Sequence, residues 1–222
     1  MYILDKGFIQ LESVSASDIS VVNAARVSFG KHTDILTEAD DGLIGYLMRE
    51  KHGTPFEHNH FKFHVKAPLF VAREWFRHRI GWSYNELSAR YSEIPLEAYV
   101  PAPENMRTQQ GKPGAYTFTQ LNNPEEKILR LKLAYYQAFE HYKALLDDGV
   151  AKEIARLVLP EGRYTEFYAT TNARALLNFF NLRSASTAQW EIQQYSKAME
   201  TLFAYHMPLT YNHFVQNGRI AP

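Results

Sequence analysis

The sequence contains no cysteine. Disulfides, thiolate metal sites and thiolate nucleophiles are therefore excluded. An excess of one charge is also missing, because Lys plus Arg and Asp plus Glu number 24 each, which gives a net charge of zero with His neutral. Sequence-independent nucleic-acid binding depends on a surplus of cationic contacts. We therefore expect no nucleic-acid partner, and any anion site must be local.

Long apolar runs are absent as well. No stretch approaches the roughly 20 apolar residues of a membrane span, and Asp5, Lys6 and Gly7 interrupt any apolar stretch at the start, unlike a signal peptide. We expect a cytoplasmic protein without a membrane partner. The 222 residues, 45% of them hydrophobic, suit a single domain that buries about 70% of the unfolded chain's surface.

The hydrophobic periodicity predicts a mixture of strands and helices. Strands are expected at residues 2–14, 58–65 and 163–171, and helices after Ser17, from Thr37, at 54–57, at 68–79, at 123–148, at 151–160, at 172–183 and at 186–208. Thr54 and Ser186 are both expected to cap helices through capping boxes. The class is α+β, with a small mixed or antiparallel sheet packed against several helices and a mainly helical second half. Residues 103–123 are expected to form a flexible excursion.

The stretch RHRIGWSYNELSARYS, residues 77–92, gathers arginines, aromatic residues and hydroxyl groups in one place. Basic residues at a helix C-terminus complement the helix dipole, and this explains one or two of the arginines. It leaves Asn85, Glu86, Ser88 and Arg90, which follow on a predicted turn, without a reason. Guanidinium groups match phosphates in bidentate geometry, so the cluster favours a nucleotide-type ligand.

Two further clusters have competing interpretations. The histidines at 52, 58, 60 and 64 invite a metal site, but Lys62 lies among them on the predicted strand face. A zinc site needs convergent ligands without an ammonium between them, so no metal is expected. In NARALLNFFNLR, residues 172–183, the polar side chains Arg174, Asn178 and Asn181 share one helix face. A solvated face usually carries Glu and Lys, so this stripe favours ligand contact.

Taken together, these motifs resemble the flavin-dependent thymidylate synthases. The resemblance rests on RHR followed by SYNELSARYS, on AARVSF at 24–29, TPFEH at 54–58, IARLVLP at 154–160, NARALLNFFNLR and AQWEIQQY at 188–195. Two departures stand out. Eight residues rather than seven separate Arg79 from Ser88, and the extra residue is expected to bulge the loop near Gly81 and Trp82. Glu74 stands where a relative typically has Gln.

The resemblance implies reductive C5 methylation of deoxyuridine monophosphate (dUMP), with methylenetetrahydrofolate as carbon donor and FAD, reduced by NADPH, as hydride source. It also implies a homotetramer with active sites shared between subunits. The expected FAD-binding residues are Thr54, Arg77, His78, Arg79, Glu86, Asn172, Arg174 and Asn178. The expected nucleotide-binding residues are Glu74, Arg77, Glu86, Leu87, Ser88, Ala89, Arg90, Arg156 and Arg183. Arg183 is expected to stabilise the N3-deprotonated pyrimidine, and His52 to assist the folate or flavin step.

Two alternatives remain open at the level of sequence. One is a non-enzymatic protein that binds nucleotides or single-stranded RNA, with Trp82, Tyr84 and Tyr91 as stacking partners for bases. The other is a degenerate relative that binds nucleotide but not flavin. A colourless purified protein would favour either alternative over the enzyme.

Overall fold

The centre of the protein is a five-stranded antiparallel sheet. The structure is a computed structural model that describes residues 1–222. In spatial order the strands are β1 (Tyr2–Ile3), β2 (Gly7–Ser15), β3 (His60–Pro68), β7 (Tyr164–Asn172) and β4 (Trp82–Glu86). Helices follow and flank this sheet, so the predicted α+β class is confirmed.

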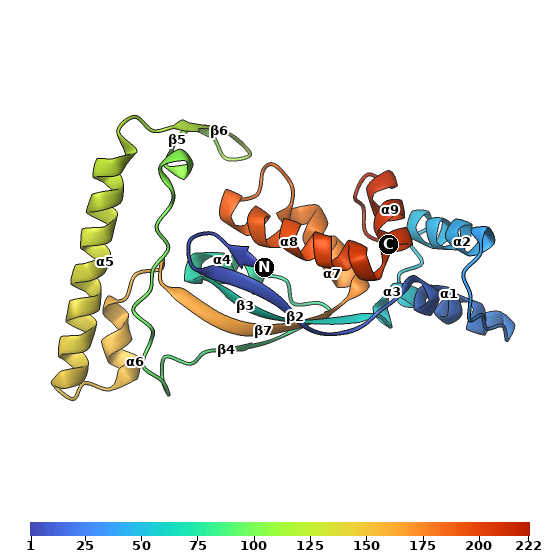
Figure 1. The fold of residues 1–222 in the computed structure, drawn as a ribbon, viewed down its shortest axis with the longest axis horizontal. Helices are drawn as coiled ribbons and strands as arrows, with labels where there is room; N and C mark the ends of the chain where they lie inside the picture. Colours follow the sequence, from blue (N-terminus) through green and yellow to red (C-terminus); the bar gives the residue numbers. More distant parts are fainter.

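One face of the sheet is apolar because side chains alternate along each strand. Phe61, Phe63 and Val65 on β3 are fully buried, as predicted. The helices α4 (Leu69–Trp75), α7 (Ala173–Arg183) and α8 (Trp190–His206) lie over this face (Figure 1). The opposite face carries polar and aromatic side chains and has no helix over it in this view.

Smaller helices pack at the end of the sheet where β3 begins. They are α1 (Asp18–Arg26), η1 (Val27–Phe29), α2 (Glu38–Arg49), α3 (Thr54–Glu57) and α9 (Pro208–Gln216). Ser17 caps α1, and its hydroxyl accepts a hydrogen bond from the backbone nitrogen of Ser20 at 3.2 Å. The two predicted capping boxes are wrong, because Gly53 is the N-cap of α3 and Gln189 is the N-cap of α8, neither with a side-chain cap bond.

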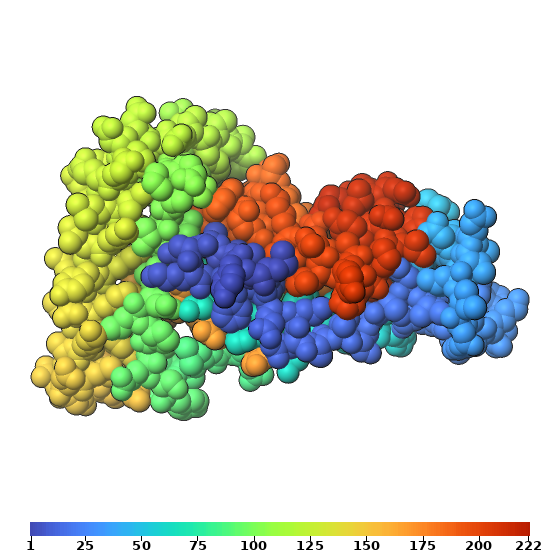
Figure 2. Space-filling view, viewed as in Figure 1, coloured from blue at the N-terminus to red at the C-terminus, as the bar shows by residue number.

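An arm stands at the other end of the molecule (Figure 1). It consists of η2 (Pro103–Asn105), β5 (Arg107–Lys112), β6 (Ala115–Gln120), the long helix α5 (Pro124–Asp147), α6 (Lys152–Ala155) and η3 (Arg156–Val158). The segment expected to be a flexible excursion thus contains a two-stranded hairpin. In Figure 2 the arm extends beyond the body, and the N-terminal residues cover the surface between them.

The body and the arm have separate cores. The core under the sheet contains 30 buried residues, whereas the arm has a cluster of five: Ala89, Ile94, Tyr142, Ala155 and Leu159. Since burial of apolar area is the main stabilising contribution, the body is the more strongly stabilised part. None of the helices has the length and apolar character needed to cross a membrane.

Candidate active site

The arginine-rich turn begins earlier than the sequence predicts, because α4 ends at Trp75 instead of near Arg79. The hydroxyl of Tyr84 can donate to the carbonyl of His78, at 2.8 Å, or of Trp75, at 3.2 Å. These tertiary bonds take up carbonyls at the end of the helix. Of the residues expected on a turn after it, Asn85 and Glu86 lie on strand β4 instead, whereas Ser88 and Arg90 belong to a turn as predicted.

The turn packs against the N-terminus of α7 at Gly81. This glycine has a φ of +73°, and a Cβ there would lie 2.9 Å from both Ala175 Cβ and Asn172 Nδ2, so only glycine fits this approach. Strand β4 then pairs with β7 without a register shift, from Trp82 opposite Thr171 onward. The extra residue therefore produces no bulge in β4.

Arg183, at the C-terminal end of α7, joins two residues of α4 and the turn. Its Nη1 donates to Glu74 Oε2 at 2.8 Å, and its Nη2 donates to the Glu74 carbonyl at 3.1 Å. Its Nε donates to His78 Nε2 at 2.9 Å. The charged side chains of Arg183 and Glu74 are largely buried, with exposed fractions of 19% and 23%. The structure thus brings together three of the predicted site residues.

The protonation of this cluster follows from its surroundings. Burial, with Arg183 and Arg77 nearby, lowers the pKa of His78 to about 4. His78 is therefore neutral at neutral pH, which lets its Nε2 accept the hydrogen bond that Arg183 Nε donates. Burial raises the pKa of Glu74, although the guanidinium of Arg183 opposes this shift. The cluster therefore holds one firmly cationic group and one carboxylate of increased basicity.

Four of the eight predicted FAD-binding residues lie on or beside the N-terminal half of α7: Thr54, Asn172, Arg174 and Asn178. The side chain of Asn172 caps this helix by accepting from Ala175 nitrogen at 2.9 Å, as predicted. Arg174 donates to Glu57 on α3 at 2.6 Å, which ties the helical turn containing Thr54 to α7. Asn178 is exposed one turn further along α7. A helix N-terminus carries partial positive charge and free N–H groups that favour anions.

Four arginines have no carboxylate partner: Arg77, Arg79, Arg156 and Arg163. The first two are exposed on the turn beside α7, and Arg156 begins η3 in the arm. Unpaired guanidinium groups are available to phosphates. Three of them are among the residues predicted from the sequence, whereas Arg163 is not. Its pKa is lowered by burial, opposed by the nearby Glu86 carboxylate.

The remaining nucleotide-binding candidates follow β4 and lie against the arm. Glu86 accepts from the Thr165 hydroxyl at 2.7 Å. Leu87 and the turn from Ser88 come next, and Ala89 is buried in the small core of the arm. The exposed Arg90 donates from Nε to Glu153 Oε2 at 2.9 Å. Arg90 therefore has to exchange this partner for any anionic ligand.

The histidine cluster behaves differently. His52 is exposed and stacks on Tyr46, with ring centroids 5.7 Å apart, and no hydrogen bond joins it to Arg183. His64 stacks on Tyr168 on the open face of the sheet and lies 3.2 Å from Glu166. Histidines and carboxylates form no group of three that could hold a metal ion.

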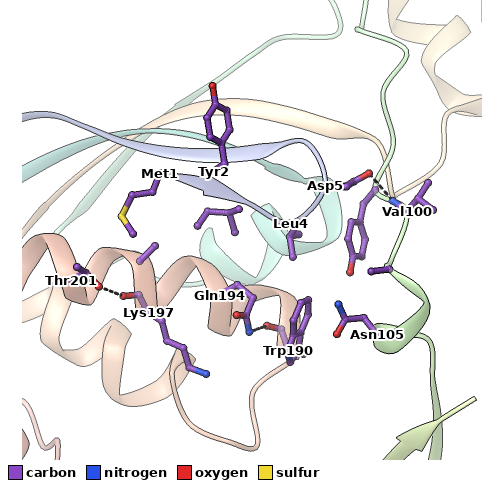
Figure 3. Close-up of a pocket in the computed structure, with 14 residues that line it drawn as sticks. Met1, Tyr2, Leu4, Asp5, Val100, Asn105, Trp190, Gln194, Lys197 and Thr201 are labelled. Carbon is purple, nitrogen blue, oxygen red and sulfur yellow. Dashed lines mark hydrogen bonds between the residues drawn. The ribbon is translucent and has the colours of Figure 1, made fainter.

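A hollow lies elsewhere, between the N-terminal hairpin, residues 99–105 and α8 (Figure 3). Its volume is about 660 Å³, and its lining includes Trp190 and Lys197. None of the predicted site residues lines it. Glu191, directly after Trp190, accepts two hydrogen bonds from Arg107 Nη2, at 2.9 and 3.0 Å. We place the candidate site at Arg183 because that is where unpaired cations and perturbed groups meet.

The chain is similar in sequence and structure to known proteins. The family described as "Thymidylate synthase complementing protein" matches residues 10–209. The flavin-dependent thymidylate synthase of Thermosipho melanesiensis is 47% identical over 214 residues, covering 96% of this chain and 93% of the relative. That of Thermus thermophilus is 44% identical over 218 residues, covering 97% of this chain and 78% of the relative.

Among solved structures, the UMP/dUMP methylase PolB from Streptomyces cacaoi bound with 5-Br dUMP has a TM-score of 0.91 and 43% sequence identity. The match covers 100% of both chains. The same enzyme bound with 5-Br UMP has a TM-score of 0.89 and 44% identity. The resemblance inferred from the sequence motifs is therefore confirmed, and this chain belongs to the thymidylate synthase complementing protein family.

Proposed function

We propose that the chain is a flavin-dependent thymidylate synthase. It methylates dUMP at C5, with methylenetetrahydrofolate as the carbon donor and FAD, reduced by NADPH, as the hydride source. The observation that carries the proposal is the position of Arg183, which is fixed between Glu74 and His78 beside the unpaired cations of the turn. Relatives at 44–47% identity that bear this name support it.

The residues around the N-terminus of α7 suit FAD. Arg77 and Arg79, exposed on the turn beside α7, offer free guanidinium groups to the pyrophosphate. Thr54 and Asn178 are exposed and provide neutral hydrogen-bonding groups, while the carboxylate of Glu57 is held by Arg174. When bound, the flavin supplies the hydride that completes the methyl group.

The nucleotide lies, in our proposal, between Arg183 and the turn from Ser88. Arg90 and Arg156 bind the phosphate, and Arg183 stands beside N3 of the ring. A fixed cation next to N3 favours the deprotonated ring, which increases electron density at C5 and makes this carbon nucleophilic. The chain has no cysteine, so activation of the ring by a thiolate is not available to it. We assign His52 to the folate or flavin step.

We further propose that the protein is a homotetramer with shared active sites. Leu129, Leu133 and Tyr136 on α5 follow one another at helical spacing and are 57%, 54% and 63% exposed. An apolar stripe of this kind is typical of an interaction surface. Light scattering after size-exclusion chromatography measures the assembly, and a monomeric mass with full activity would contradict shared sites.

The RNA-binding alternative loses its stacking platform in this fold. Trp82 is only 9% exposed and stacks on Tyr84, with centroids 5.7 Å apart. The Tyr84 hydroxyl faces the end of α4. Of the three aromatic residues considered, only Tyr91 is exposed. A base therefore cannot stack on Trp82 or Tyr84 without disrupting the core.

The test of the proposed function is a turnover assay. The purified protein, loaded with FAD, is incubated without oxygen with dUMP, methylenetetrahydrofolate and NADPH, and nucleotides are separated by chromatography. We expect thymidylate to form only when all components are present. The same assay with UMP measures selectivity, since the similar solved structures are described as UMP/dUMP methylases. A flavin-loaded protein that methylates neither nucleotide would refute the proposal.

A further inference from the structure

The ion pair between Glu74 and Arg183 has an unused acceptor. Oε2 of Glu74 and its backbone carbonyl both bind the guanidinium. Oε1 makes no hydrogen bond within the protein, and the side chain remains 23% exposed. The site thus presents guanidinium N–H groups and a carboxylate oxygen side by side to a ligand.

This donor–acceptor pair matches the edge of a pyrimidine. The ring presents N3–H, a donor, between two carbonyl oxygens that are acceptors. A carboxylate oxygen accepts from N3–H, while guanidinium N–H groups donate to the neighbouring carbonyl. Because N3–H is the ionisable proton of this edge, the group that faces it decides where the proton goes when the ring becomes an anion.

The other charged groups around Glu74 cannot take that proton. Arg183 and Arg77 are cations and have no acceptor. His78 Nε2 already accepts from Arg183 Nε. Glu191 on α8 is held by two hydrogen bonds from Arg107 and lies within reach of the Tyr99 hydroxyl. Glu74 is therefore the group with a free basic oxygen next to the cation.

Building on the proposed function, we propose that Glu74 is the catalytic base that accepts the N3 proton of the bound nucleotide. The N3–H bond breaks, its electron pair stays on the ring and delocalises toward C5, and an O–H bond forms on Oε1 of Glu74. Arg183 stays cationic, and its anionic partner changes from the Glu74 carboxylate to the deprotonated ring. The net charge of the site does not change, so no buried charge is left uncompensated.

The environment supports this role. Burial raises the pKa of Glu74, Arg183 lowers it, Glu191 raises it and Arg77 lowers it, with a net shift upward. A carboxylate with a raised pKa is a better proton acceptor at neutral pH. A glutamine amide at this position could not accept a proton. The inference therefore depends on the carboxylate of Glu74.

The direct test follows the proton during binding of 5-bromo-dUMP, without folate or reductant. Ultraviolet difference spectra report the N3 anion, and calorimetry in two buffers counts the protons released. For the native protein we expect an anionic ring with almost no proton release. For Glu74→Gln we expect a neutral ring or, where an anion forms, release of about one proton to the buffer. Equal spectra and proton counts in both proteins would overturn the inference, as would a neutral ring in the native protein.

Kinetics provide a second readout. We expect Glu74→Gln to reduce kcat at neutral pH by about 10²-fold, the size of a general-base contribution. The kcat of this variant should recover as the pH rises. Glu74→Asp retains a carboxylate and should keep the acidic limb of the native profile. Glu161→Gln, at the surface pair with Arg73, is the matched control. A profile of Glu74→Gln parallel to the native one contradicts the inference alone, whereas a native protein without dUMP binding or turnover contradicts the proposed function.

Discussion

The two halves of the candidate site are supported by different hydrophobic cores. The flavin half, defined by Thr54, residues 77–79, Asn172, Arg174 and Asn178, lies along α7 and the turn beside it, next to the 30-residue core. The nucleotide half, defined by residues 88–90 and Arg156, stands on the five-residue core of the arm. Strand β4 connects them. We therefore expect this chain's share of the flavin half to be preformed and the nucleotide half to depend on how the arm is held.

Arg183 is connected to both halves. It lies on α7 in the flavin half, which we call the firm half because it lies beside the 30-residue core, yet in our proposal it acts on the nucleotide. Its fork is already oriented by Glu74 and His78, which limits the reorganisation needed when the ring becomes an anion. Arg90, in contrast, is exposed and has to leave Glu153. The comparison predicts that changes in the firm half affect chemistry and that changes in the arm affect nucleotide affinity.

The largest expected effect is that of Arg183→Lys. Lysine keeps the charge but loses the planar fork that bonds Glu74 and His78, so kcat should fall by about 10²-fold or more. Affinity for dUMP should fall much less. Steady-state kinetics and a binding titration measure both quantities, and Arg73→Lys at an exposed pair serves as control. Equal losses in turnover and affinity would argue against a role in ring ionisation.

Arg90→Ala tests the nucleotide half. Loss of a charge-assisted hydrogen bond weakens binding by roughly 1.5–3 kcal/mol, while FAD affinity should not change. Arg130→Ala removes a similarly exposed arginine, paired with Glu126 on α5, and controls for general effects on the arm. A calorimetric titration that gives native dUMP affinity would remove Arg90 from the site.

The pH dependence of stability tests the firm half. The pKa of His78 is lowered to about 4, below the value of about 6.5 in an unfolded chain. The folded state thus binds fewer protons between these values, so its full stability is present above about pH 6.5 and is lost as the pH falls toward 4. Because His78 is partly exposed, we expect the free energy of unfolding to fall by only roughly 1–2 kcal/mol over this range. Urea unfolding of the native protein and of His78→Asn at several pH values measures this loss. If the free energy of unfolding changed equally with pH in both proteins, a buried neutral His78 would be contradicted.

Tyr142→Phe should give the smallest effect. Its hydroxyl accepts from the backbone nitrogen of Ile94 at 3.1 Å in the arm core, and leaving that buried donor unpaired costs about 1 kcal/mol. We expect dUMP binding to weaken several-fold without a change in FAD binding. Tyr116→Phe, on the exposed strand β6 of the arm, is the control. If FAD binding weakened equally, the two halves would not be independent.

The parts of the fold that could be predicted depend on neighbours in sequence. Ser17 and Asn172 cap their helices as expected, because a side chain bonds a backbone group three residues away. The end of α4 could not be predicted, since it depends on Tyr84 from the next strand. Strand β4 was taken for a turn because the strand it pairs with, β7, lies more than 80 positions further along the chain.

The same distinction applies to the site. Sequence motifs identified the arginine turn and the polar face of α7, because each lies within one segment. The bonds from Arg183 to Glu74 and His78 join residues 109 and 105 positions apart, and no local pattern contains that information. Arg163 escaped notice because it is a single arginine in a strand-like segment. The assignment of individual residues to FAD, folate and nucleotide remains a prediction.

The most direct test of the central claim is the visible absorbance of the purified protein. We predict a yellow protein that contains FAD and that bleaches when NADPH is added without oxygen in the presence of dUMP. This result would establish a flavin site that is functional in the protein as purified. A colourless protein that cannot be reconstituted with FAD would contradict the account, because the residues around the N-terminus of α7 would then bind no flavin.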